Sequence, residues 1–221
     1  LHLSRSPLIG DRTGFLQGED VPDPVEGMLR VFRMAAAGIT IERRRAAAGI
    51  PCNTFHAPAL FDPFREKLAA EGLPIALIHM LEETADHIRA LLPQTSRVGL
   101  LSTTGTRDSG AYRAIFSRHG MEVIEIPEEF QARLHEAIYH RSWGLKASSP
   151  ASKKAVDRVE GYGKLLVKSG AEAVILGCTE LPLAVPEGIY GGVPWIDPMT
   201  ALARAMIRES APGKLKALGL H

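Results

Sequence analysis

Residues 173–180 read Ala173-Val174-Ile175-Leu176-Gly177-Cys178-Thr179-Glu180. The apolar part is short and contains β-branched side chains, which is typical of a strand buried on both faces of a parallel sheet. It ends at Gly177, where the backbone can turn sharply and approach a ligand closely. Cys178 is therefore predicted to lie at the carboxyl end of a strand, the edge of an open α/β sheet where ligands bind.

A second turn of the same kind contains the other of the two cysteines. Pro51-Cys52-Asn53-Thr54 comes just before a helical pattern and supplies two short polar side chains. Neither cysteine belongs to a Cys-x-x-Cys pair and the eight histidines show no ligand spacing, so we predict no metal site. Two lone thiols, each at a turn into a helix, instead indicate reduced cysteines that act as a pair.

Strand and helix patterns alternate along the chain, which predicts an α/β fold. Strands are expected at residues 74–78, 98–101, 121–126, 173–177 and 193–196. Helices are expected at about residues 24–37, 60–68, 81–92, 112–119, 130–138 and 155–166, and from residue 198 onward. This alternation implies a parallel sheet covered by helices on both faces, with right-handed crossovers.

The composition is that of an ordinary soluble globular protein, with 45% hydrophobic and 23% charged residues. A formal net charge of +1 argues against a nucleic-acid partner, and the short run Arg43-Arg44-Arg45 is interpreted as a solvated face. No apolar run approaches the roughly 18 residues that a membrane span needs, and the first residues lack a signal-peptide core. We therefore expect a cytoplasmic protein with no membrane partner.

Two opposed thiols can carry out a reaction that one thiol cannot. A thiolate is both a nucleophile and a base. If Cys52 and Cys178 flank one bound molecule, one can remove a proton from carbon while the other returns a proton to the opposite face. The product is inverted at that carbon, and in principle no metal or organic cofactor is needed. The site must then hold the substrate carboxylate tightly and exclude water.

Donors for a carboxylate are available at both cysteine turns and in a loop that opens a helix, a ready anion site. They are Asn53, Thr54, Thr179, Thr103, Thr104 and Thr106. Each of these side chains can instead cap a helix. Glu180 is either a first-turn carboxylate favoured by the helix dipole or a group that orients and tunes Cys178. A lone cysteine is most often a buried small hydrophobe, and only the pairing of the two turns favours catalysis.

With both turns laid out, the sequence resembles the aspartate/glutamate racemase superfamily and, within it, the aspartate racemase branch. The motifs that carry the resemblance lie between about residues 11 and 207; they are Pro51-Cys52-Asn53-Thr54, Leu101-Ser102-Thr103-Thr104-Gly105-Thr106 with Ser109-Gly110 and Tyr112, Leu176-Gly177-Cys178-Thr179-Glu180-Leu181, and Val193-Pro194 through Asp197-Pro198. The resemblance implies two similar parallel-sheet α/β domains related by pseudo-twofold symmetry, with the site in the cleft between them. It also implies catalysis without pyridoxal phosphate and a homodimer.

Two cationic anchors for a second substrate carboxylate are implied by the resemblance. They match Arg12, in Gly10-Asp11-Arg12-Thr13, and Lys146, in Gly144-Leu145-Lys146-Ala147. A diacid needs such a second anchor, and arginine can grip a carboxylate with two parallel hydrogen bonds. The first domain is expected to comprise residues 1–95 plus 187–221 and to carry Cys52. The second is expected to comprise residues 96–186 and to carry Cys178.

The sequence departs from the family pattern at three places. Relatives begin with an extra strand and a glycine-rich turn, and the match starts after them. Relatives also place an apolar strand directly before the first cysteine turn, whereas Ile39-Thr40-Ile41 is followed here by Glu42-Arg43-Arg44-Arg45 and then by Ala46 to Gly49. Four charges do not fit a buried strand, so either the strand is short or the local structure differs. Arg107 also places a cation beside the threonine loop.

We predict a cofactor-independent racemase of an acidic amino acid, with aspartate as the expected substrate and Cys52 and Cys178 as the two acid/base groups. The expected substrate-binding residues are Arg12, Asn53, Thr54, Thr103, Thr104, Lys146, Thr179 and Glu180. An alternative is a cysteine-dependent isomerase or decarboxylase of a small dicarboxylic acid on the same fold. A second alternative, from another class, is a catalytically silent protein that binds a small carboxylate.

Overall fold

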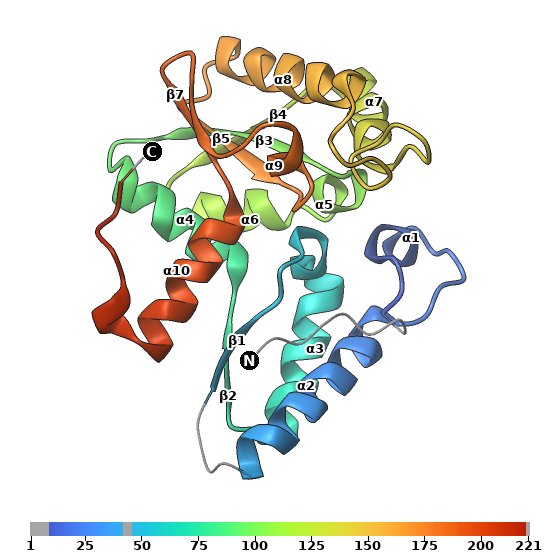
Figure 1. The fold of residues 1–221 in the computed structure, drawn as a ribbon, viewed down its shortest axis with the longest axis vertical. Coiled ribbons are helices and arrows are strands. Elements are labelled where there is room, and N and C mark those ends of the chain that lie inside the picture. The colour runs from blue at the N-terminus through green and yellow to red at the C-terminus, as the bar shows by residue number, and fades with distance from the viewer. Residues whose placement is uncertain (1–8, 42–45, 220–221) are drawn as a thin grey trace.

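The computed structural model describes residues 9–41 and 46–219, which form two separate sheets (Figure 1). A two-stranded parallel sheet of β1 (Ala46–Gly49) and β2 (Ile75–Ile78) lies in the lower half of the view, beside α2 (Pro24–Ile41) and α3 (Pro58–Ala70). The upper half contains a five-stranded sheet in the order β4-β3-β5-β7-β6. Its strands are β3 (Arg97–Ser102), β4 (Glu122–Glu125), β5 (Ala173–Gly177), β6 (Gly188–Tyr190) and β7 (Val193–Ile196).

The helices expected from the sequence are present, and several short helices join them. The remaining elements are α1 (Arg12–Leu16), the 3-10 helix η1 (Asn53–His56), α4 (Met80–Leu91), α5 (Thr104–Asp108), α6 (Ala111–Arg118), α7 (Glu128–Tyr139), α8 (Lys153–Lys168), α9 (Leu181–Ala184), α10 (Pro198–Ser210) and the 3-10 helix η2 (Pro212–Lys214). Strands thus alternate with helices, and the predicted α/β fold class is confirmed. The pseudo-twofold relation between domains stays a prediction.

Strand β5 lies at the centre of the five-stranded sheet. It pairs in parallel with β3 on one side, from Val98 opposite Ala173 to Ser102 opposite Gly177, and with β7 on the other. All five of its residues are buried, because helices cover both faces of the sheet. This burial explains the unbroken apolar run.

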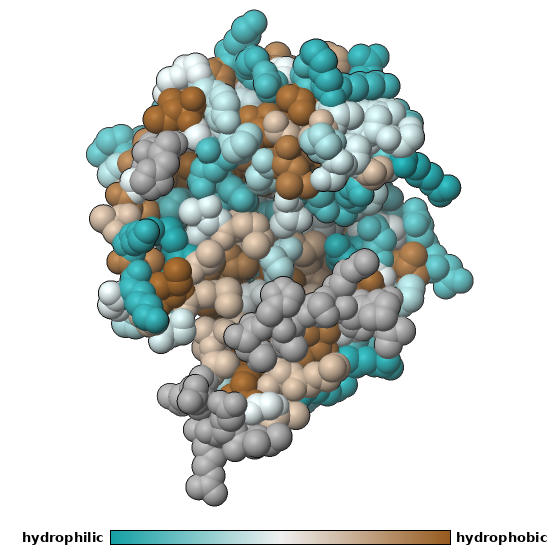
Figure 2. Space-filling view, viewed as in Figure 1, coloured by the Kyte–Doolittle hydropathy of each residue, from teal (hydrophilic) through white to brown (hydrophobic). Residues whose placement is uncertain are grey.

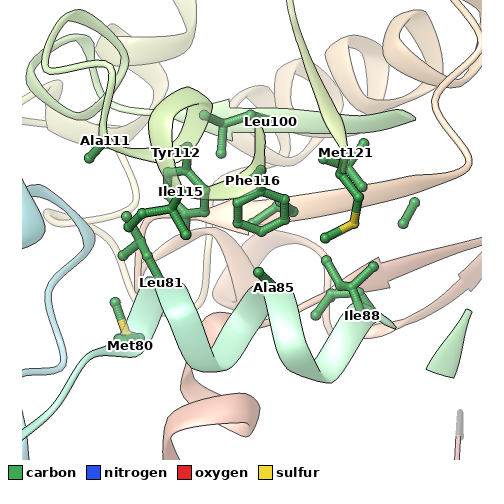
Figure 3. Packing of buried hydrophobic residues seen from close by; sticks show 14 of the residues in the cluster. Met80, Leu81, Ala85, Ile88, Leu100, Ala111, Tyr112, Ile115, Phe116 and Met121 are labelled. Carbon is green, nitrogen blue, oxygen red and sulfur yellow. The ribbon is translucent and has the colours of Figure 1, made fainter. Parts of the chain in front are cut away.

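Each face of this sheet has its own hydrophobic core. On one face, α4, α6 and α10 bury a cluster that includes Leu81, Ile88 and Phe116 (Figure 3). On the other face, α7 and α8 pack over the sheet, and Gly163 of α8 lies so close to Trp195 of β7 that a Cβ there would clash with the indole ring. The two cores hold the carboxyl ends of β3 and β5 in place.

We expect Leu81→Ala to lower the free energy of unfolding by about 2–5 kcal/mol, because it removes a fully buried side chain and leaves a cavity. Figure 3 shows Leu81 directed from α4 into the cluster, beside Ile115 and Tyr112 of α6. Denaturant titration measures the change. Leu218→Ala, at a position that is 37% exposed, is the matched control and should change stability by less than about 0.5 kcal/mol. Equal losses in the two variants would contradict this account.

Residues 39–41 do not form the short strand that was one of the two interpretations of the sequence; the local structure differs, which was the other. Ile39, Thr40 and Ile41 are the last residues of α2 and not a strand, and the helix continues through Gly38. The strand that leads to Cys52 is β1, in which small residues pair with β2. Gly49 is needed there, because a Cβ at this position would clash with Leu202 of α10. The charged run Glu42–Arg45 lies outside the described residues.

The strand pairing also differs from the expected grouping of residues 187–221. Strands β6 and β7 complete the five-stranded sheet, with β7 parallel to β5 and β6 antiparallel to β7. The chain then crosses in α10, which packs on α4 and on β1 (Figure 1). Residues 188–196 therefore belong with the sheet that contains β5, because β7 makes its backbone hydrogen bonds with β5 on one side and with β6 on the other. The rest of the domain division stays a prediction.

Hydrophilic and hydrophobic residues are interspersed over the face seen in Figure 2. Within residues 9–41 and 46–219, no helix has both the length and the apolar character needed to cross a bilayer.

Candidate functional site

Cys178 lies directly beyond the end of β5, as predicted. Gly177 makes this position possible, because a Cβ there would lie 2.6 Å from Leu100 Cδ1 and 2.8 Å from the carbonyl oxygen of Leu101. Cys178 is buried, and its Sγ donates a hydrogen bond of 2.9 Å to Glu180 Oε2. The end of β5 and Gly177 therefore place the Cys178 thiol in contact with the Glu180 carboxylate.

Glu180 is the centre of a small polar cluster. It accepts a second hydrogen bond from Thr179 Oγ1 at 3.1 Å, and its Oε1 lies 3.0 Å from Lys146 Nζ. Burial opposes the charge of Glu180, but the Cys178 hydrogen bond and the Lys146 ammonium outweigh it and lower the pKa of the carboxyl group. Burial and the Glu180 carboxylate together raise the pKa of Cys178 well above its usual range. Cys178 is therefore a protonated thiol near neutral pH, beside a base.

We expect Glu180→Gln to speed alkylation of Cys178 by iodoacetamide several-fold at mildly alkaline pH. The carboxylate disfavours the Cys178 thiolate, so its removal lowers the pKa of the thiol and raises the thiolate fraction. Mass spectrometry of alkylated peptides measures the rate, and Cys52 in the same molecule is the internal control. A slower or unchanged rate at Cys178 would contradict the role assigned to Glu180.

Cys52 caps the amino end of η1 with an extended backbone and is partly exposed. Arg12 is the first residue of α1, where Asp11 caps the helix by accepting a 2.8 Å hydrogen bond from Gly14 N, and the Arg12 guanidinium donates to the Gly10 carbonyl oxygen at 3.2 Å. Burial opposes the charge of Arg12, but a charge interaction and a side-chain hydrogen bond with Cys52, together with Asp11, raise the pKa of the guanidinium. Arg12 therefore lies within electrostatic reach of Cys52.

Tyr139 connects the surroundings of Arg12 with those of Lys146. Its hydroxyl donates a 3.2 Å hydrogen bond to Asp11 Oδ2, and Lys146 Nζ lies 4.6 Å from the centre of its ring. Burial raises the pKa of Tyr139 to about 12, and Cys178 is among the groups whose charge acts on the phenol. Tyr139 therefore contacts both Lys146 and Asp11, the residue that precedes Arg12.

Tyr112 contacts the first cysteine turn and lies within electrostatic reach of Cys178. It is fully buried, and its hydroxyl donates a 2.6 Å hydrogen bond to Asn53 Oδ1, next to Cys52. Burial raises the pKa of Tyr112 well above its usual range, and Asp197 and Cys178 add to the rise because their charges act on the phenol. Asn53 Nδ2 is buried and has no hydrogen-bond partner among the described residues. Beside Cys52, the Asn53 side chain thus uses its oxygen and leaves its nitrogen unpaired within the described residues.

The threonines form contacts of their own. Thr54 Oγ1 lies 2.8 Å from Thr106 Oγ1 and 3.3 Å from Thr103 Oγ1, and the last two are 3.1 Å apart, so these hydroxyls join η1 to the start of α5. Thr104 donates its backbone N–H to His135 Nδ1 at 3.2 Å and accepts a weak 3.5 Å hydrogen bond from Gln131. Substrate contacts by these threonines stay predictions.

Arg107 does not add a cation to the threonine loop. Its guanidinium donates to the Ile126 carbonyl oxygen at 2.9 Å and to Gln131 Oε1 at 3.2 Å. It also pairs with Glu125 and Glu128, at 3.7 and 2.8 Å. The charge is therefore neutralised on α7 and β4, which explains how it is tolerated beside the loop.

Two contacts of this network, Tyr139 with Asp11 and Tyr112 with Asn53, were not found from the sequence. Asp11 and Tyr139 are common surface types, and only the fold brings residues 128 positions apart into contact. Tyr112 was part of a motif, but its contact with Asn53 could not be read from spacing.

An open hollow of about 310 Å³ beside Lys146 is lined by residues 145–151 and Leu183, and neither cysteine lines it. No group of three or more potential metal ligands occurs within the part of the chain that the structure describes.

The protein thus combines an α/β fold with a polar network that contains two free cysteines and two cationic side chains. The chain belongs to the Asp/Glu/Hydantoin racemase family, whose family model matches residues 2–206. The resemblance inferred from the motifs is thus confirmed.

Individual relatives are 29–30% identical to this chain over the aligned residues. A glutamate racemase from Pseudomonas putida is 29% identical over 215 residues, which cover 96% of this chain and 74% of the relative. A glutamate racemase from Synechococcus is 30% identical, with 92% and 71% covered. A third, from Pseudomonas entomophila, is covered over 66% of its length. The chain thus spans about two thirds to three quarters of these relatives.

Solved structures show the same fold. An aspartate racemase from Picrophilus torridus superposes with a TM-score of 0.67 at 24% identity, covering 92% of this chain and 76% of that one. An aspartate racemase homologue from Pyrococcus horikoshii has a TM-score of 0.60 at 25% identity, with 89% and 79% covered.

Proposed function

We propose that the protein is a cofactor-independent racemase of an acidic amino acid, with aspartate preferred. The observation that carries the proposal is the network through which both free thiols share neighbours: Tyr112 bonds to Asn53 beside Cys52 and also lies within electrostatic reach of Cys178. Relatives named for aspartate and for glutamate racemisation support the substrate class. Neither name decides between the two acids.

In the proposed reaction, the thiolate of one cysteine takes the α-proton and the thiol of the other donates a proton to the opposite face of the carbanion. Cys178, held as a thiol beside Glu180, is suited to donate. In the reverse direction, the Cys178 thiolate left by the first step takes the α-proton and the Cys52 thiol donates a proton to the opposite face. One C–H bond breaks and one forms, and the two thiols exchange protonation states.

Binding would use the donors that the site leaves available. Asn53 Nδ2, buried without a partner, is proposed to hold the α-carboxylate, with Thr179 beside Cys178 and Thr54, Thr103 and Thr104 near it. Arg12 and Lys146 are proposed to hold the distal carboxylate. Burial opposes the charge of Lys146, but Tyr139 and Glu180 outweigh it and raise the pKa of the ammonium, so a full cation is ready. The substrate carboxylate must share this cation with Glu180.

The test is incubation of L-aspartate and L-glutamate with the full chain in D2O, followed by chiral chromatography and mass spectrometry. We expect deuterium at the α-carbon of the inverted product. Inversion without deuterium would overturn the proposal. Binding of the amino acid without any exchange would also overturn it and would indicate a catalytically silent carboxylate-binding protein. Loss of carbon dioxide or formation of an unsaturated acid would indicate the decarboxylase or isomerase. We also propose a cytoplasmic homodimer, and light scattering checks the dimer.

A further inference from the structure

His56 makes two hydrogen bonds that join the Cys52 turn to α4. Its Nδ1 lies 2.9 Å from the carbonyl oxygen of Cys52, and the backbone N–H of Met80 donates to its Nε2 at 3.2 Å. Because Nε2 accepts from an N–H group, Nδ1 must carry the ring proton and donate it to the Cys52 carbonyl. The imidazole therefore has one donor and one acceptor, and both are used.

The ring of His56 is also fixed by packing. It is 2% exposed, stacks on Phe61 with centroids 4.9 Å apart, and meets the His79 ring edge-on at 4.6 Å. Burial, helped by the charge that His79 would carry, lowers the pKa of His56 to about 3 although its bond to Cys52 opposes this. His56 is therefore a neutral imidazole near neutral pH, and its Nδ1 proton stays in the hydrogen bond to Cys52.

Both backbone polar groups of Cys52 are hydrogen-bonded when His56 donates to its carbonyl oxygen. Its N–H donates to the Ile50 carbonyl at 2.8 Å, and its carbonyl accepts from Phe55 N at 3.2 Å as well as from His56. The four-residue η1 is too short to hold a fixed geometry by its own hydrogen bonds. The hydrogen bond from Met80 of α4 to His56 therefore helps to fix the geometry of η1.

Helix α4 is packed in the same core as β3 and β5, the strand that ends at Cys178. We propose that His56 is a positioning residue, which fixes the Cys52 thiol relative to Cys178 by donating to the Cys52 carbonyl and accepting from the start of α4. This inference rests on the proposed function in so far as the two thiols act on one carbon. The contact itself does not depend on turnover.

Two substitutions separate the two bonds. In His56→Asn, the amide nitrogen can take the place of Nδ1 and donate to the Cys52 carbonyl, while the bond to Met80 is lost. In His56→Gln, the amide oxygen can take the place of Nε2 and accept from Met80, while the donation to Cys52 is lost. Each variant gives up one buried hydrogen bond, so similar losses in melting temperature are expected. A purely structural role would therefore affect both variants alike.

The first measurement is the ratio of Cys52 to Cys178 alkylation by iodoacetamide, read by mass spectrometry without substrate. We expect His56→Gln to change this ratio about fivefold to tenfold, in keeping with the loss of one hydrogen bond, and His56→Asn to stay within about twofold. The second measurement is turnover, in which His56→Gln should lower kcat about tenfold or more and leave KM nearly unchanged. The isotope effect with α-deuterated substrate should rise only for the enantiomer that Cys52 deprotonates.

An unchanged alkylation ratio in His56→Gln, or the same change in both variants, would overturn the inference. If the unsubstituted protein shows no α-carbon exchange while the ratio still changes in His56→Gln alone, the positioning role stands and the proposed racemisation fails. If exchange occurs and both variants keep full kcat, the racemisation stands and the positioning role fails.

Discussion

Cys52→Ala and Cys178→Ala are each expected to abolish racemisation of aspartate, with kcat lowered by roughly 10⁴-fold or more. Each thiol serves one face of the α-carbon in the proposed mechanism, and alanine can neither take nor donate a proton there. Chiral chromatography of timed samples measures the loss. The double variant should be hardly worse than either single variant, because the two thiols act as one unit.

A second measurement makes this prediction specific to a pair of bases. A variant that keeps one thiol can still exchange the α-proton of one enantiomer with solvent, without inverting it. Residual deuterium uptake should therefore be confined to one enantiomer in Cys52→Ala and to the other in Cys178→Ala. Full turnover by either variant would contradict the paired-thiol mechanism, and circular dichroism confirms that both variants are folded.

Lys146→Met is expected to lower kcat/KM for aspartate by about 100-fold, the effect of removing one partner of a partly buried charge pair. The change removes the proposed anchor for the distal carboxylate and leaves Glu180 without its cation, 3.0 Å away in the unsubstituted protein. Steady-state kinetics with both enantiomers measures the loss. The thioether chain keeps most of the volume of the lysine stem, so packing against Tyr139 is largely retained.

Two variants control for charge and for Glu180. Lys164→Met removes an exposed cation that pairs with Glu160 on α8, and it should leave kcat/KM within about twofold. Lys146→Met alone should also lower the free energy of unfolding, because it leaves the Glu180 carboxylate unpaired. Adding Glu180→Gln removes that carboxylate, so the stability should recover while kcat/KM stays low. If Lys146→Met alone retains activity within about threefold, Lys146 does not anchor the substrate.

Local patterns in the sequence were sufficient for β3, β4, β5 and β7 of the larger sheet and for both cysteine turns, whereas β1 and β6 were not predicted. The run from Ala173 to Leu176 is apolar throughout because β5 is covered on both faces, and Gly177 is where a Cβ would clash. The same logic identified β3 and the Asp197-Pro198 start of α10. It was weakest at residues 39–41 and 46–49, where a short strand and a different local structure were both left open, and where the structure has the end of α2 and then strand β1.

The sequence by itself thus determined the α/β class, the family and the position of Cys178 at a strand end, since each follows from side chains that are neighbours along the chain. Only the tertiary structure decided how the site is connected. Tyr139 reaches Asp11, Tyr112 reaches Asn53, and His56 reaches the start of α4. These contacts join residues 128, 59 and 24 positions apart, and no local pattern encodes them, because they depend on how whole helices pack against one another.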